Sequence, residues 1–88
     1  MLLSSLEGLV LGLLAANGPT YGFDLVRASR GRLKRGSAYV TLGRMVDKGF
    51  LMSRVDVHPG KGPGRRIYAL TPLGRRALKA AHIIHGKA

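Results

Sequence analysis

The most abundant chemically active side chains in this sequence are positively charged. Its 88 residues carry fifteen Lys and Arg against four Asp and Glu, a formal net charge of +11. No Lys or Arg precedes Arg27, so an apolar, slightly acidic first segment is followed by a basic remainder. An excess of this size on so short a chain favours a polyanionic partner, and double-stranded DNA is the first candidate.

The other chemistry-bearing residues do not form a catalytic or metal-binding pattern. The four acids are scattered and the chain has no cysteine, so it offers neither paired carboxylates nor a thiolate. His82 and His85 lie three residues apart without a third ligand nearby, and His58 stands in a Gly- and Pro-rich segment. We therefore expect no enzyme, no cofactor and no metal site.

The segment that follows Gly36 has the pattern of a helix that could read a DNA groove. Ser37 is a suitable N-cap and Gly49 a suitable end. At about 100° per residue, Ala38, Leu42, Met45 and Val46 share one face, and Arg44 lies opposite, with Tyr39 and Thr41 at the flanks. The Arg44 fork could bond O6 and N7 of guanine in the major groove. The predicted recognition residues are Ser37, Tyr39, Val40, Thr41, Arg44 and Lys48.

Further cations stand where they could contact phosphates. Two precede the predicted recognition helix, whose first backbone amides also favour an anion. Residues 58–64 consist almost wholly of turn formers around one Lys, and two Arg follow. A Lys on such a hairpin can lie along the DNA backbone or enter the minor groove. The predicted phosphate contacts are Lys34, Arg35, Lys61, Arg65 and Arg66.

The elements that must position these residues can be read from caps and periodicity. Ser4 to Glu7 form a capping box before a helix that ends at Gly18, and Thr20 can cap a second helix over residues 21–29. Strands are expected over residues 50–57 and 67–70, and Thr71 and Pro72 begin a last helix that runs to about residue 85. The predicted fold is a mainly α (α+β) winged helix-turn-helix of order α-α-α-β-β-α, in one domain spanning residues 1–88.

The first predicted helix is apolar nearly all round, so more than one of its faces must be covered. A small domain without disulfides often gains buried area from a partner subunit. We therefore expect a homodimer held by the first and fourth helices, within residues 1–16 and 72–88. The predicted interface residues are Leu6, Leu9, Leu11, Leu14, Leu78, Ala81 and Ile84.

Three motifs in this order resemble those of PadR-type transcriptional regulators. Tyr21-Gly22-Phe23-Asp24-Leu25 is similar to the Y-G-Y-E-L/I opening of that family's second helix, and Gly36-Ser37-Ala38-Tyr39, followed by Leu42, Arg44 and Gly49-Phe50-Leu51, is similar to its recognition-helix stretch. Residues 62–74 resemble its G-P-x-R-K-Y-Y-x-L-T-x-x-G wing. Ala38 and Val40 depart from the family's Leu and Pro. The resemblance implies a winged helix dimer that binds operator DNA and usually represses.

Two other classes of function stay open on the sequence. The first is a basic RNA-binding module, although RNA binding alone does not require the two-sided apolar helix. The second is an architectural DNA-binding protein without much sequence preference, which the high charge per residue allows. No segment is long and apolar enough for a membrane span, and Glu7 with the lack of a basic start argues against a signal peptide. We expect a cytoplasmic protein with no membrane partner. The sequence indicates no particular operator or small-molecule effector.

Overall fold

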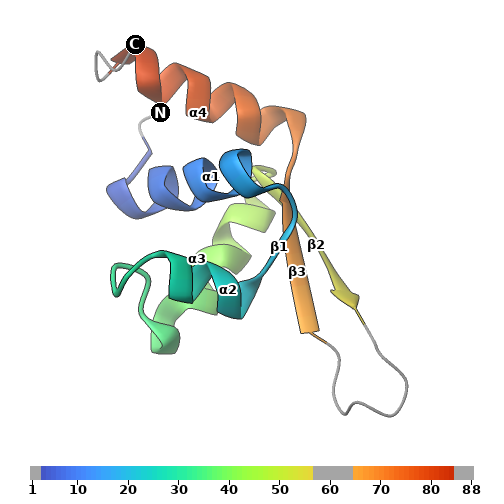
Figure 1. Cartoon of the computed structure of the whole chain (residues 1–88). Helices are drawn as coiled ribbons and strands as arrows, with labels where there is room; N and C mark the ends of the chain where they lie inside the picture. The colour runs from blue at the N-terminus through green and yellow to red at the C-terminus, as the bar shows by residue number, and fades with distance from the viewer. Residues whose placement is uncertain (1–2, 57–64, 85–88) are drawn as a thin grey trace.

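The computed structural model describes residues 3–56 and 65–84, with side chains as far as residue 81. Its elements are α1 (Ser5–Asn17), β1 (Thr20–Tyr21), α2 (Gly22–Ala28), α3 (Arg35–Asp47), β2 (Leu51–Asp56), β3 (Arg65–Leu70) and α4 (Pro72–Ile84). The strands form an antiparallel sheet of order β1-β3-β2. In Figure 1, α1 lies between α4 and the pair α2 and α3, with the sheet to one side. The predicted winged helix-turn-helix is confirmed, with one strand added.

The ends of the first and last helices match the sequence prediction. The Glu7 amide donates to Ser4 Oγ at 3.1 Å and the Ser4 amide donates to Glu7 Oε1 at 3.0 Å, so the capping box is present. Thr71 precedes α4, and its hydroxyl oxygen accepts a bond from the Gly74 amide at 3.0 Å. Among the described helices, none is long and apolar enough to cross a membrane.

The predicted start of the recognition helix is wrong by three residues, because Lys34 and not Ser37 is the N-cap. The helix begins at Arg35 after Lys34, and Ser37 already lies in its first turn, with its amide bonded to the Lys34 carbonyl at 3.1 Å. The cause lies upstream, where the buried Leu33 donates its amide to Ser29 Oγ at 3.0 Å. This bond fixes the turn that precedes Lys34, and Lys34 then begins the helix as an N-cap without a side-chain hydrogen bond.

The short strand β1 is absent from the sequence prediction. Thr20 and Tyr21 pair with Tyr68 and Ile67 of β3, so α2 begins at Gly22, one residue later than expected. Thr20 does not cap α2, because its hydroxyl donates to the Gly18 carbonyl at 2.8 Å. Two residues are too few to show a strand's alternation.

One hydrophobic core joins the helices to the inner face of the sheet. Leu11 is fully buried in it and Leu14 is 2% exposed, so these two residues offer no surface to a second copy. Their assignment to a dimer interface is therefore wrong, because the core of this small domain uses the side of α1 that carries them. The buried apolar residues are Val10, Leu11, Leu14, Leu25, Leu33, Ala38, Leu42, Met45, Phe50, Leu51 and Tyr68.

The tightest backbone approach joins the turn after α3 to the start of α4. The Thr71 amide donates to the Phe50 carbonyl at 3.1 Å. Gly74 is buried, and a Cβ placed on it would lie 2.1 Å from that carbonyl oxygen. Only glycine fits at this position, and this explains the glycine that closes the Thr71-Pro72-Leu73-Gly74 motif.

We expect Gly74→Ala to destabilise the fold by about 1–3 kcal/mol, the usual cost of overpacking against atoms that cannot move aside. Thermal unfolding should then occur roughly 4–8 °C lower for each kcal/mol lost. Gly43→Ala is the matched control, because a Cβ at Gly43 would meet nothing within 4 Å. Gly43 also lies inside α3, where alanine favours the helix more than glycine does. This variant should leave stability equal or higher. Equal melting temperatures for the two variants would contradict this packing.

Candidate nucleic-acid interface

One side of α3 is buried and the other faces solvent, as the periodicity predicts. Ala38, Leu42 and Met45 are fully buried, whereas Ser37, Val40 and Arg44 are exposed, with Val40 at 56%. The exposed residues are three and four positions apart, which places them on one stripe along the helix. We call Ser37, Val40 and Arg44 the α3 stripe. Thr41 is half-buried beside it.

Tyr39 lies on a different side of α3 from the α3 stripe. A Cβ on Gly22 would come within 2.7 Å of Tyr39 Cε1, so the Tyr39 ring rests directly on the start of α2. The Tyr39 residue is still 48% exposed and lines a groove between α3 and the sheet. Tyr39 is therefore held against α2 next to the α3 stripe, and Gly22 is the residue that makes room for it.

The groove beside α3 has a volume of about 290 Å³ and mixes aromatic, polar and charged groups. Arg66 enters it from β3 and donates to Ser53 Oγ at 3.1 Å. Burial raises the pKa of Tyr68, which keeps that hydroxyl protonated. The groove thus presents hydrogen-bond donors next to the outer side of α3. Its lining residues are Tyr39, Gly43, Val46, Asp47, Ser53, Arg66 and Tyr68.

The predicted hairpin cations do not form one patch. Arg65 and Arg66 are adjacent in a strand, so their side chains point to opposite faces of the sheet. Arg66 lines the groove beside α3, whereas the Arg65 guanidinium lies 5.3 Å from the centre of the Phe23 ring. Lys61 lies outside the described residues. The sequence prediction also missed Arg54, an exposed residue of β2 on the face that carries Arg65.

The turn before α3 gathers cations at the start of that helix. Ser29 and Leu33 are buried and fix the turn. The residues between and after them are exposed, and two of these cations, Arg30 and Arg32, stand outside the predicted contact set. Positive charge here adds to the positive end of the helix dipole. The exposed cations are Arg30, Arg32, Lys34 and Arg35.

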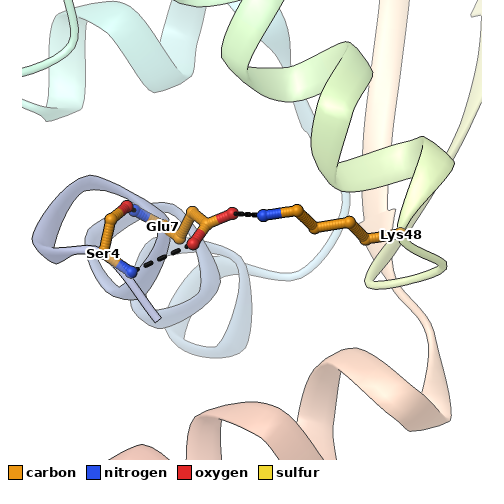
Figure 2. A network of polar contacts seen from close by, with 3 residues as sticks. All are labelled: Ser4, Glu7 and Lys48. Carbon is orange, nitrogen blue, oxygen red and sulfur yellow. Dashed lines mark hydrogen bonds and ion pairs between the residues drawn. The ribbon is translucent and has the colours of Figure 1, made fainter. Parts of the chain in front are cut away.

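Lys48, predicted as a DNA contact, is engaged within the chain. Figure 2 shows its ammonium reaching from the end of α3 to Glu7 of α1, with 2.6 Å between Nζ and Oε2. The other Glu7 oxygen accepts from the Ser4 amide. Partial burial opposes ionisation of Glu7, but the hydrogen bonds from Lys48 and Ser4 and the Lys48 charge outweigh it and lower its pKa. This ion pair joins the two helices.

Comparison with known proteins gives one family. The family model described as the transcriptional regulator PadR-like family matches residues 10–80. No curated protein matches this chain.

Three of the solved structures that share the fold are relatives of this kind. A PadR family transcription regulator from Clostridium difficile is 28% identical, with a TM-score of 0.75 over 88% of this chain and 82% of that chain. A PadR-like transcription factor from Bacteroides fragilis is 26% identical, with a TM-score of 0.79 over 93% and 81%. Bacillus subtilis PadR, solved in complex with operator DNA, is 27% identical, with a TM-score of 0.74 over 85% of this chain and 44% of that chain.

The Glu7–Lys48 pair predicts a pH dependence of stability. A lowered folded-state pKa stabilises the fold above the unfolded value, near 4.5, and this contribution is lost as pH falls through the folded value. Glu7→Gln keeps an oxygen for the Ser4 amide but loses the charge. At neutral pH we expect it to cost roughly 0.2–1 kcal/mol. This cost should disappear as pH falls through the lowered folded-state pKa of Glu7.

Denaturant unfolding at a series of pH values measures this effect. Lys48→Met removes the other half of the pair and is the matched variant. The double variant should lose no more stability than either single one. Strictly additive losses would show that the ion pair contributes nothing.

Proposed function

The chain belongs to the PadR-like family of transcriptional regulators, and we propose that it represses transcription by binding a palindromic operator as a homodimer. On this proposal residues 1–88 act as one DNA-binding domain in the cytoplasm. The observation that carries the proposal is the exposed α3 stripe next to the basic turn that precedes α3. A structural neighbour, Bacillus subtilis PadR, was solved with operator DNA. The chain spans 44% of that neighbour.

The α3 stripe supplies the side chains for base recognition. Arg44 lies near the middle of the exposed side, and its fork suits the O6 and N7 acceptors of guanine. Val40 is exposed beside it and suits contact with a thymine methyl group. Ser37 and Thr41 can bond to bases or phosphates. Tyr39, which contacts the start of α2 and lines the groove, is proposed to contact a phosphate there.

Cations on two sides of the α3 stripe supply the phosphate contacts. Arg30, Arg32, Lys34 and Arg35 surround the start of α3, and Arg66 lies in the groove on its other flank. Cations at these positions could contact the two sugar-phosphate backbones that border one major groove. Such contacts fix the register of the helix without reading sequence. Lys61 and Arg65 are proposed as contacts of the hairpin, and Lys48 supports α3 through Glu7.

A homodimer through α1 and α4 suits this arrangement. The two helices contact each other on the side of the molecule away from α3 (Figure 1). A dimer axis there would leave both copies of α3 free to enter successive major grooves, about 34 Å apart. Leu6, Leu9, Leu78 and Ala81 are half-exposed on these helices. The Ile84 side chain lies outside the described part of the chain.

The function is tested by selecting the preferred sequence from random duplexes and measuring affinity for it. We expect an inverted repeat, and we expect Arg44→Ala to cost about 1–3 kcal/mol per half-site while relaxing the sequence preference. Arg76→Ala removes the same charge from an exposed site on α4 and is the control. It should leave the preference unchanged.

Three outcomes would contradict parts of this proposal. Tighter binding to structured RNA than to duplex DNA at matched salt would favour an RNA-binding module. Equal affinity for all duplexes would favour an architectural protein. Equal losses on selected and unselected duplexes for Arg44→Ala would make Arg44 a phosphate contact and leave base reading to its neighbours.

The dimer interface can be tested on two neighbouring residues of α4. Ala81 is half-buried and Ala80 is exposed. A buried unpaired carboxylate costs several kcal/mol, and each 1.4 kcal/mol is about tenfold in dissociation constant. We expect Ala81→Glu to weaken the dimer by about a hundredfold or more in sedimentation equilibrium, and Ala80→Glu to leave it intact. A monomeric unmodified protein at micromolar concentration would contradict the dimer.

A further inference from the structure

Two aromatic residues lie outside the core at the edge of the sheet. Tyr21 ends β1 and Phe23 follows in the first turn of α2. Their rings are stacked, with centroids 5.6 Å apart and planes 11° from parallel. Phe23 is 37% exposed and is not part of the buried core. Tyr21 is half-buried and is also absent from the buried core, so the pair contributes little to core packing and its other contacts need an explanation.

Both aromatic residues contact the last described residue pair of the β2–β3 hairpin. Asp56 of β2 stands opposite Arg65 of β3, directly next to residues 57–64. The Tyr21 hydroxyl donates to Asp56 Oδ2, and the Arg65 guanidinium lies over the Phe23 ring at 5.3 Å. We call Asp56 and Arg65 the hairpin base. The aromatic pair therefore contacts both of its members.

The chemistry of these contacts is suited to ordering an arginine while leaving it exposed. A cation over a ring face is held by the ring quadrupole and keeps its N–H groups available for a phosphate. The bond to Asp56 raises the pKa of Tyr21, which keeps the hydroxyl a donor at neutral pH. Arg54 also approaches Tyr21 and adds to the positive charge on this face.

We propose that Tyr21 and Phe23 are positioning residues for DNA binding, which hold the hairpin base so that Arg65 is ordered before a phosphate reaches it. The proposal rests on the proposed function and adds residues that need not touch DNA. An unordered arginine loses its rotamer freedom on binding, and this loss weakens affinity. A guanidinium already held on a ring loses less. The segment that begins α2 thereby influences a contact on a distant part of the chain.

The test compares three substitutions in the aromatic pair. Phe23→Leu keeps an apolar side chain but removes the ring, and should weaken duplex binding roughly two- to fivefold per subunit, the range expected for an exposed cation–π contact. Phe23→Tyr keeps the ring and should restore wild-type affinity. Tyr21→Phe keeps the stack but lacks the bond to Asp56, and should show a loss of its own. Equal melting temperatures would separate these effects from unfolding.

A spectroscopic readout reports the Arg65 position without DNA. Protons of the Arg65 side chain should show an upfield ring-current shift in the unmodified protein and in Phe23→Tyr, and should lose it in Phe23→Leu. Arg65 protons that do not respond to Phe23→Leu would overturn the proposal, because the ring would then not hold the guanidinium.

A double-mutant cycle with Arg65→Gln separates positioning from a general structural role. In the Arg65→Gln background, Phe23→Leu should cause no further loss of duplex affinity. The same loss in both backgrounds would overturn the positioning role while leaving DNA binding itself established. Failure of the unmodified protein to bind duplex DNA would overturn the proposed function, and this inference with it.

Discussion

The burial of one side of α3 is the constraint on which the remaining structure depends. Ala38, Leu42 and Met45 lose all solvent contact in the core, and a helix has no freedom to rotate once three such residues are fixed. Ser37, Val40 and Arg44 are exposed because of that packing, and no other contact is needed to aim them. Burial of each large apolar side chain stabilises the fold by about 1.5–3 kcal/mol. The α3 stripe therefore keeps its orientation for as long as the core stays folded.

Charge is divided along the chain in a way that matches this packing. The helix α1 carries no cation, and its single acid, Glu7, meets Lys48 at the end of α3. The ion pair therefore connects the apolar helix α1 to the end of α3. Exposed cations stand before α3, on both faces of the β2–β3 hairpin and on α4. Their mutual repulsion is tolerated there because solvent and counterions screen it. A polyanion that neutralises them gains affinity with strong salt dependence.

The features that follow from local rules could be predicted from the sequence. The capping box at Ser4, the buried face of α3 and the cap before α4 follow from spacing and side-chain chemistry within a few residues. The errors concern partners distant in the chain. Strand β1 forms because β3 offers it an edge, Leu11 is buried because other elements cover it, and Lys48 is engaged because Glu7 lies near. Nothing within ten residues of these positions encodes those partners. Arg65 and Arg66 looked alike in sequence, but strand alternation sends them to opposite faces.

The burial of Leu11 and Leu14 in the core determines which residues are left to couple the domain to a second copy. Because Leu11 and Leu14 are buried in the core, the large apolar residues that α1 leaves for a second copy are half-exposed ones such as Leu6 and Leu9. A dimer on this side must then draw more of its buried area from α4. That helix is fixed to the chain by the backbone approach of Gly74 to Phe50, directly after α3. In such a dimer, the distance between the two copies of α3 would be set by the short connection from α3 through Phe50 to α4. The Glu7–Lys48 pair would hold α1 at the same end of α3.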